Sequence, residues 1–319
     1  VDLPGLMAAA GGSFVSGIAH DLNPVERKIT LKDARVLSYD LVSLGIGSTP
    51  RDSLDPEVSH HSRIIKPLSR AAELKRTLFR LASQRGRPAE EVCTVVVGAG
   101  AAGIEIALAI AAVLDRAKQP RKILLLDSGP QILAGSYARF RQGVTRLLAA
   151  RSINLRLKTR AKAVGRDHVL LEDGEKLPSH LTVWLTGAAG LPLLARSGLA
   201  VDSRGFLLVD DALRSVSDPS VHAAGDCATL SRFPDTPKAG VYAVRQGPVL
   251  WESLQAAVRN GRLPTYRPQR DFLSILNTGD GKAFLRYKGI HSHSRWAWRF
   301  KDFIDRRFMA RYQHLGDHP

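Results

Sequence analysis

Short alternations of apolar and polar residues begin at residue 28, and a longer helical period follows them. Lys28 to Lys32 alternates as a half-buried strand does, and residues 36–48 form a second strand-like run that ends in glycines. Residues 52–61 are polar and include a proline, which predicts a linker between domains. Over residues 68–84 apolar side chains recur at steps of three and four, which predicts an amphipathic helix.

The most informative pattern begins at residue 92. Val92 to Val97 is an apolar, β-branched run, typical of a strand buried on both faces of a parallel sheet. The glycine-rich segment GAGAAG follows at 98–103, and residues 104–114 continue as an Ala-rich helix. Arg121 to Asp127 is another buried strand, and it ends in an acid. Strand, glycine turn, helix and strand make one βαβ unit, whose crossover we expect to be right-handed.

The same alternation of strands and helices continues downstream. The predicted elements are a helix over 136–150, strands over 153–157 and 181–186 with hairpins over 158–178, strands over 206–210 and 221–226, and a helix over 239–259. Such an order predicts an α/β fold.

Composition narrows the class of protein. With 319 residues, 44% hydrophobic and 24% charged, the chain suits about two globular domains. The longest apolar run, 107–114, is far shorter than the ~20 residues that cross a bilayer. Cys93 and Cys227 lie far apart without CxxC spacing, and no signal peptide is visible, which favours a reducing, cytoplasmic location.

The charge is strongly basic, with 46 Lys and Arg against 30 Asp and Glu, a net charge of +16. Such a charge favours anionic partners such as nucleotide cofactors, nucleic acid or acidic lipids, or it reflects a basic proteome background. The chain has no nucleic-acid-binding motif and no zinc-ligand spacing, so we expect no nucleic acid as a partner. His291 and His293 alone are weak evidence for a metal, and we expect none.

The glycines of the βαβ unit have separate roles in a dinucleotide site. Gly98 would make the tight turn, Gly100 would let the backbone approach a pyrophosphate, and Gly103 would let the helix pack closely on the strand. The helix N-terminus then offers N–H groups and the positive end of its dipole to the phosphates. The alternative is a glycine turn in an unrelated α/β protein.

Asp127 selects among dinucleotides. A carboxylate at this strand end accepts hydrogen bonds from the adenosine ribose and repels a 2′-phosphate, so we expect NADH to be preferred over NADPH. Arg139 and Arg141 lie downstream and can weaken that preference. The alternative for Asp127 is a solvated acid at the end of a strand.

A second strand ends in Gly225 and Asp226. This places a carboxylate at the carboxyl end of a strand, where ligands of open α/β sheets bind. Asp226 would accept hydrogen bonds from the ribityl hydroxyls of a flavin, or it merely begins a turn.

Together these motifs resemble the pyridine-nucleotide-dependent flavoprotein superfamily. Within it the chain is most similar to type II NADH dehydrogenases, and especially to the NADH-dehydrogenase-like domain fused ahead of selenophosphate synthetase (selenide, water dikinase). The superfamily motifs are LGIGS from Leu44, GAGAAGIE from Gly98, LTGA from Leu185 and AAGDC from Ala223; those of the subgroup are LPGL from Leu3, GIGSTP from Gly45, PKAGVYAVRQGPVL from Pro237 and RRFMARY from Arg306.

The resemblance implies a glutathione-reductase-like fold with two Rossmann-like domains that bind FAD and NAD. Residues 1–62 and 205–275 would form the FAD domain, 63–204 the NAD domain, and 276–319 a basic aromatic C-terminal segment. Glu105 would lie near the nicotinamide, and Lys238, Ala239 and Gly240 near the isoalloxazine ring. The cofactor-binding residues it implies are Gly98, Gly100, Gly103, Glu105, Asp127, Gly187, Gly225, Asp226, Lys238, Ala239 and Gly240.

The chain departs from the family pattern in two ways. The first βαβ unit of the FAD domain is missing, so either the sequence is truncated or the protein has lost its main grip on FAD. Residues 3–10 contain no redox-active cysteine pair, which predicts that the enzyme is not a disulfide reductase. We expect NADH to reduce the flavin and electrons to pass to a small-molecule acceptor, a quinone or a selenium species. No catalytic residue is assigned.

The segment 296–312 interleaves aromatic and cationic residues. Positions 296, 300, 303–304 and 308 share one helical face. That face suits the inner surface of a membrane, docking on its own domain, or anchoring of a selenophosphate synthetase domain or partner. The alternative function is a nucleotide-binding sensor or docking module for that synthetase, without turnover of its own.

Overall fold

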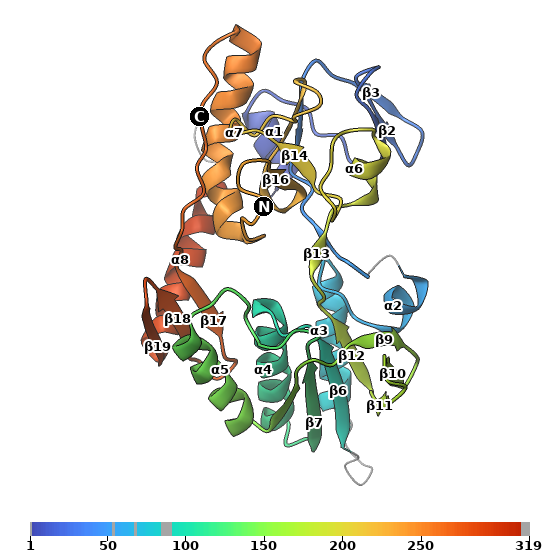
Figure 1. Cartoon of the computed structure of the whole chain (residues 1–319), viewed down its shortest axis with the longest axis vertical. Coiled ribbons are helices and arrows are strands. Elements are labelled where there is room, and N and C mark those ends of the chain that lie inside the picture. The colour runs from blue at the N-terminus through green and yellow to red at the C-terminus, as the bar shows by residue number, and fades with distance from the viewer. Residues whose placement is uncertain (1, 53–54, 67–68, 84–90, 314–319) are drawn as a thin grey trace. The chain divides into compact units, whose positions relative to one another are not determined.

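The chain folds into two compact units, and each unit is built from separate stretches of the sequence. The computed structural model describes residues 2–52, 55–66, 69–83 and 91–313 (Figure 1). Unit 1 comprises residues 1–49, 188–270 and 308–319, and unit 2 comprises residues 50–187 and 271–307. The chain passes between them at four places: within β5 (Thr49–Pro50), directly before β13 (Ala188–Ala189), after residue 270 and after residue 307.

Unit 2 is built on a four-stranded parallel sheet. Its order is β12-β6-β7-β8, with β6 at Val92–Val97, β7 at Arg121–Leu126, β8 at Ile153–Arg156 and β12 at Leu181–Trp184. Helix α4 (Ala101–Arg116) connects β6 to β7, and α5 (Ala138–Ala150) connects β7 to β8. This is the βαβ arrangement that the sequence predicts, and all six elements lie within two or three residues of their predicted bounds.

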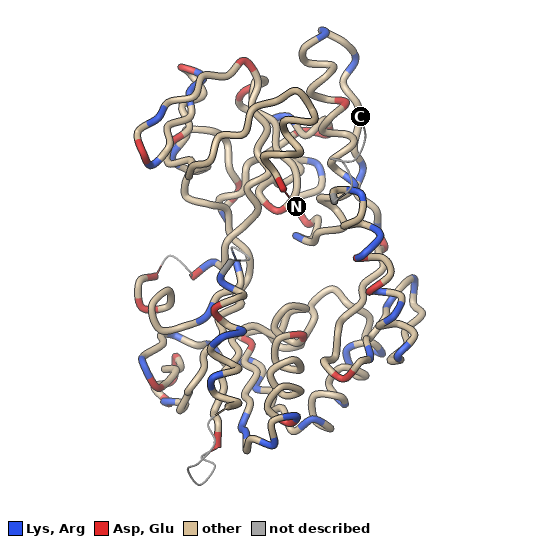
Figure 2. Tube along the Cα trace, turned by 180° about the vertical axis from the view of Figure 1, so that it is seen from behind, with Lys and Arg blue, Asp and Glu red and all other residues tan. Residues whose placement is uncertain are grey.

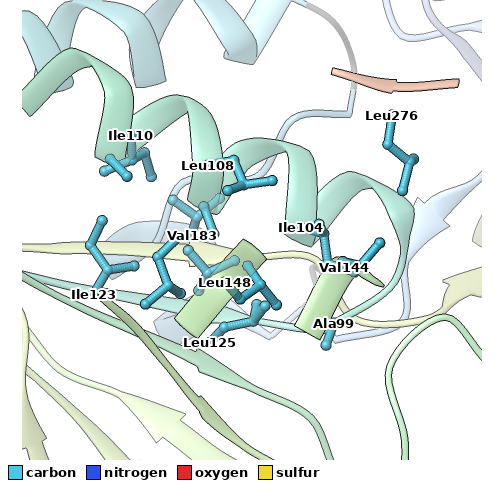
Figure 3. Packing of buried hydrophobic residues seen from close by; sticks show 14 of the residues in the cluster. Ala99, Ile104, Leu108, Ile110, Ile123, Leu125, Val144, Leu148, Val183 and Leu276 are labelled. Carbon is cyan, nitrogen blue, oxygen red and sulfur yellow. The ribbon is translucent and has the colours of Figure 1, made fainter. Parts of the chain in front are cut away.

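The main core of unit 2 lies between this sheet and the helices. Ile104 and Leu108 of α4 and Val144 and Leu148 of α5 pack onto Ile123, Leu125 and Val183 of the sheet (Figure 3). Helix α3 (Ser69–Ala82) adds Leu74, Leu78 and Leu81, as the helical period of the sequence predicts. The ends of that predicted helix, residues 68 and 84, lie outside the described residues.

The opposite face of the sheet is covered by an antiparallel meander. Strands β9 (Ala161–Val164), β10 (His168–Leu171) and β11 (Lys176–Pro178) form the predicted hairpins, and their apolar side chains pack on Val95, Val97, Leu124 and Leu126. The sheet strands are therefore apolar on both faces, as their β-branched sequences indicate.

The C-terminal segment forms a second small sheet in unit 2. Strands β17 (Ser274–Asn277), β18 (Ala283–Tyr287) and β19 (Ile290–Ser294) are antiparallel, and α8 (Arg295–Gln313) follows. Leu276 and Phe284 join the main core beside α4, and a smaller cluster joins the other face to Ala297 of α8. Residues 271–307 thus belong to unit 2, whereas the sequence places a boundary at residue 275 and a separate segment after it.

Unit 1 combines short strands with one long helix. A meander of β1 (Ala19–Asn23), β2 (Lys28–Leu31) and β3 (Val36–Ser38) precedes β4 (Val42–Leu44), which pairs in parallel with β15 (Val221–Ala223). The other elements are α1 (Leu3–Ala9), α6 (Pro192–Arg196), the parallel pair β14 (Leu207–Val209) and β16 (Ala228–Leu230), the 3₁₀ turn η1 (Gly225–Cys227), and α7 (Gly240–Arg259).

Two local predictions differ from the structure. The run over 36–48 is two strands, β3 and β4, because a turn separates them. The predicted linker over 52–61 contains a helix, α2 (Pro56–His61), which Asp55 caps by accepting hydrogen bonds from the N–H groups of Glu57 and Val58. Pro56 at its first turn favours the helix, because a proline there lacks only an N–H that would stay unbonded. The linker prediction rested on the polar composition of residues 52–61 and did not recognise Asp55 as a helix cap.

His222 of β15 is fully buried in unit 1. Neither ring nitrogen has a hydrogen-bond partner among the described residues. Burial lowers the pKa of His222, against the opposing charge of Asp210, while Arg214 lowers it further. Burial therefore favours the neutral imidazole, and this lowers the free energy of unfolding as the solution becomes acidic.

We expect His222→Phe to reduce the acid sensitivity of unit 1. Because the folded pKa of His222 lies below the ordinary value of 6.5, only the unfolded chain takes up this proton as pH falls through that value. The melting temperature of the wild type should therefore fall more steeply than that of the variant between about pH 7.5 and pH 5.5. His20→Gln, at an exposed position of the same unit, is the control and should keep the wild-type slope. Parallel slopes for all three proteins would contradict the expectation.

Candidate functional site

The glycine turn of unit 2 is shaped by close contacts between backbones. Gly98 has a φ of +108°, and a Cβ there would overlap the carbonyl of Leu185. A Cβ on Gly103 would overlap the carbonyl oxygen of Gly98, so α4 approaches the turn as closely as backbone permits. A Cβ on Gly100 would meet nothing within 4 Å. The first and third glycines therefore serve packing, and the second faces open space.

The N-terminus of α4 is available to an anion. Gly100 is the N-cap and makes no side-chain cap, and the first turn contains no acidic residue. The 16-residue helix therefore presents N–H groups and the positive end of its dipole at the carboxyl edge of the sheet. An anionic pyrophosphate fits this arrangement.

Asp127 joins the glycine turn to the loop that follows β7. Its Oδ2 accepts a hydrogen bond from the N–H of Ala99 at 2.7 Å, and its Oδ1 accepts one from Gly129 at 2.7 Å. The carboxylate is thus fixed in orientation by two backbone donors. Each carboxylate oxygen can accept a further bond, so recognition of a ribose hydroxyl remains compatible with this role.

Two more predicted residues of unit 2 lie at different distances from the turn. The carbonyl of Leu185, after β12, lies against Gly98, and Gly187 follows two residues later. Gly187 is exposed, and its carbonyl accepts a hydrogen bond from the N–H of Arg51 at 2.9 Å. Glu105 lies on α4 and is partly buried. Its Oε1 accepts a hydrogen bond from the backbone N–H of Asn277 at 2.7 Å, and burial raises its pKa.

Unit 1 has a second strand-end site. The parallel strands β4 and β15 end side by side, so the glycine-rich residues 45–48 adjoin Gly225 and Asp226. Ser48 donates a hydrogen bond to Oδ2 of Asp226 at 3.3 Å. Gly225 adopts a φ of +76°, and its N–H donates to Oε1 of the buried Gln246 at 2.6 Å. A turn in the left-handed region is best made by glycine.

Helix α7 begins beside this turn. Ala239 is its N-cap without a side-chain cap, Gly240 is its first residue, and no acid lies in its first turn. The N-terminus of this 20-residue helix is therefore free to polarise an electron-rich ligand group. Asp226 can accept hydrogen bonds from hydroxyl groups, and the N-terminus of α7 can donate to an acceptor group. A flavin with its ribityl chain fits both groups.

The ammonium of Lys238 is bound by groups of unit 1, and the expectation that Lys238 lies near the isoalloxazine ring stays a prediction. Its ammonium donates to the carbonyl of Ala228 and to Oγ1 of Thr229, and it lies 4.1 Å from the ring centroid of Phe206. Burial lowers the pKa of Lys238 to about 8, although the nearby Asp202 opposes the shift. The ammonium is therefore bound within unit 1 and anchors the residues that precede α7.

Gln246 and Ser48 were missing from the predicted site residues. Both contact the Gly225–Asp226 turn, and neither belongs to a motif whose spacing assigns a role. Ser48 ends the motif LGIGS and Gln246 lies within the motif PKAGVYAVRQGPVL, so the sequence marked both segments without assigning either residue a role.

Comparison with known proteins identifies the family. The sequence profile of the pyridine nucleotide-disulphide oxidoreductases matches residues 12–261. The chain belongs to this family. A probable NADH dehydrogenase of Dictyostelium discoideum is 28% identical over 247 residues, 70% of this chain and 55% of that protein. The demethylphylloquinone reductase of Synechocystis sp. is 27% identical over 232 residues, 70% of this chain and 55% of that protein.

The chain also has solved structural neighbours. The sulfide:quinone oxidoreductase of Aquifex aeolicus superposes with a TM-score of 0.80 at 18% identity, over 99% of this chain and 78% of that chain. NDH2 of Plasmodium falciparum, solved in complex with NADH, gives 0.75 at 13% identity, over 93% and 80%. These likenesses confirm the predicted α/β fold. The superfamily resemblance and the likeness to NADH dehydrogenases are also confirmed, whereas the resemblance to the domain fused to selenophosphate synthetase stays a prediction.

The chain spans about half the length of the relatives it matches. The two strand-end sites nevertheless lie in the matched region, residues 12–261.

The glycine turn allows packing and ligand binding to be separated by mutation. Gly100→Ala adds a methyl group in open space and should cost about 1 kcal/mol of stability, since alanine is a poorer N-cap than glycine but its Cβ meets no neighbouring atom. It should weaken NADH binding about tenfold or more, because the pyrophosphate can no longer approach the backbone. Gly103→Ala should instead prevent unit 2 from folding, because neither backbone can move away.

Fluorescence titration with NADH and thermal unfolding measure the two effects. Gly247→Ala on the exposed side of α7 is the matched control and should leave NADH binding unchanged. Unchanged affinity in Gly100→Ala would show that the dinucleotide binds elsewhere.

Proposed function

We propose that the chain carries the catalytic parts of an FAD-dependent NADH oxidoreductase that transfers electrons to a small-molecule acceptor. The observation that supports this most is the repetition of one design in both units. Each has a glycine turn after a parallel strand, a carboxylate near it, and the uncapped N-terminus of a long helix. Two such sites suit two dinucleotides, one in each unit.

In unit 2 the protein binds and orients NADH. The α4 N-terminus and the open backbone at Gly100 hold the pyrophosphate, and Asp127 holds the turn and the adenosine ribose. The carboxylate also favours NADH over NADPH, because it repels a 2′-phosphate. In unit 1 Asp226 binds ribityl hydroxyls, and α7 stabilises negative charge beside the ring. When bound, FAD accepts a hydride and passes electrons on, one or two at a time.

A quinone is the acceptor that we favour. The demethylphylloquinone reductase among the relatives acts, by its name, on a quinone. The cysteines argue against a disulfide acceptor, because the chain has only two and they are free. Cys227 is fully buried, its Sγ donates to the carbonyl of Leu44 at 3.3 Å, and burial raises its pKa, so it makes a poor nucleophile.

Visible absorption before and after anaerobic addition of NADH tests the proposal, on the protein as its gene encodes it. We expect flavin bands that bleach with NADH. Asp226→Ala should lower the flavin content, because the ribityl hydroxyls lose their acceptor, and Asp235→Ala at an exposed position of the same unit should not. Bound flavin that NADH fails to bleach would contradict the proposal.

One surface of α8 favours a second property, contact with a membrane. Trp296 and Phe303 are 62% and 57% exposed, and Phe300 stacks on Trp296 at 5.2 Å between ring centroids. Cations flank this stripe at Arg299 and Arg307. No helix in the described part of the chain is long and apolar enough to cross a bilayer. We propose that the stripe binds the surface of an anionic membrane, where aromatic side chains and cations both find partners.

Sedimentation with vesicles that contain about one-third anionic lipid tests this contact. The double variant Trp296→Ser, Phe303→Ser should lose most of its binding. Trp251→Ser removes a tryptophan of equal exposure, 63%, from α7 and should keep it. Equal binding of both variants would show that α8 does not carry the contact.

A further inference from the structure

Strand β8 is the outer strand of the four-stranded sheet in unit 2. On the side away from β7, no strand in the described part of the chain pairs with it. The carbonyl of Arg156 accepts a hydrogen bond from the N–H of Asp127 at 3.0 Å, so Arg156 directs its backbone groups toward β7. Successive residues of a strand direct their N–H and C=O groups to opposite sides, so Ile153 and Leu155 present theirs at the outer edge. An edge of this kind can pair with another strand.

A groove of about 340 Å³ lies beside this edge, between α5 and β8. Its apolar lining includes Ile132, Leu155 and Leu157. Arg141 and Arg146 of α5 add two positive charges to the lining. The groove therefore offers space for apolar side chains next to cations that can bind carboxylates.

The chain around the groove is strongly basic. Residues 128–166, which include α5, β8 and β9, contain nine Lys and Arg and no Asp or Glu. Three of these cations form ion pairs with acids from other segments of unit 2, whereas Arg141 and Arg146 form none within the described part of the chain. The Nη1 of Arg141 donates to the carbonyl of Ser136, which holds its guanidinium in place. This concentration of positive charge favours an anionic partner.

We propose that the outer edge of β8 binds an acidic, extended segment of a partner protein, which adds a strand to the sheet. Backbone groups of the segment pair with those of Ile153 and Leu155. Its apolar side chains enter the groove, and its carboxylates bind Arg141 and Arg146. Main-chain hydrogen bonds supply affinity in this mode of binding, and the groove and the charges supply selectivity.

Other occupants satisfy only part of this surface. A nucleic acid neutralises the cations but has no peptide N–H and C=O groups to pair with the strand edge. A second copy of this chain has such groups, but pairing through β8 would bring two basic, acid-free segments together, and like charges across an interface repel. An acidic peptide satisfies the edge, the groove and the charge at once.

Fluorescence anisotropy of a labelled peptide of alternating Glu and Val, added to the whole chain at low salt, tests the proposal. In an added strand every second amide faces β8 and the others face solvent. N-methylation of one alternate set of amides should therefore abolish binding, and N-methylation of the other set should preserve it. The same peptide with Lys in place of Glu should not bind. Equal effects of the two methylations, or no binding of the parent peptide, would overturn the inference.

A pair of charge reversals locates the contact. Arg146→Glu changes an exposed side chain of the groove and should weaken peptide binding about fivefold or more. Arg76→Glu changes an exposed cation on α3 of the same unit and is the matched control, which should keep the wild-type affinity. Thermal unfolding checks that both variants are folded. Equal weakening by the two variants would show that overall charge, and not the groove, holds the peptide.

Two competitors separate this inference from its alternatives. Single-stranded DNA should bind more weakly than the peptide, and DNA binding of equal strength would refute a peptide site. Saturating NADH should leave the affinity for the peptide unchanged, and displacement of the peptide by NADH would assign the groove to the nucleotide site. Peptide binding does not involve electron transfer. A protein whose flavin NADH fails to bleach would therefore refute the proposed function alone, and a protein that bleaches without binding the peptide would refute this inference alone.

Discussion

The glycine turn is packed so closely that neither Gly98 nor Gly103 tolerates a side chain, because a Cβ on Gly103 of α4 would overlap the carbonyl of Gly98, and one on Gly98 would overlap the carbonyl of Leu185. This contact fixes where α4 begins and aims its N-terminus at the carboxyl edge of the sheet. The core beneath it then forms around that placement, with Ile104 and Leu108 of the same helix packed on the sheet (Figure 3). Asp127 depends on it too, because it bonds the N–H of Ala99 within the turn. Packing and ligand geometry are in this way set by one close approach.

Both strand-end sites offer a ligand mainly backbone groups and helix dipoles. The two helix N-termini carry no capping side chain and no acid, and the predicted site residues include a single cation, Lys238. That cation is itself bound inside unit 1. The predicted site residues therefore do not supply the net charge of +16. Lys and Arg are spread over both units (Figure 2). A dipole in a partly desolvated position gives more specific orientation than mobile surface charge, which solvent and salt screen.

Helix α8 has one side that packs on the small C-terminal sheet and one side that is exposed. Ala297 is buried against the small C-terminal sheet, while the aromatic stripe is exposed. The sequence pattern indicated an amphipathic helix and left open which side docks. In the structure Ala297, Trp298 and Phe300 pack on the C-terminal sheet, whereas Trp296 and Phe303 are exposed. A segment that the sequence set apart from residue 276 onward is in fact joined to α4 through Leu276 and Glu105.

The sequence by itself determined the βαβ unit of unit 2, the glycine turn, the acid that follows β7 and the strand that leads into Gly225 and Asp226. These features depend on backbone preference and apolar period over a few neighbouring residues, which the sequence carries directly. Only the tertiary structure decided that Ser48 bonds Asp226 across 178 positions, that Glu105 bonds Asn277 across 172, and that Lys238 turns inward to Thr229. Such contacts depend on which distant segments pack together and which polar groups are left to be satisfied once they do, and no local pattern encodes that choice.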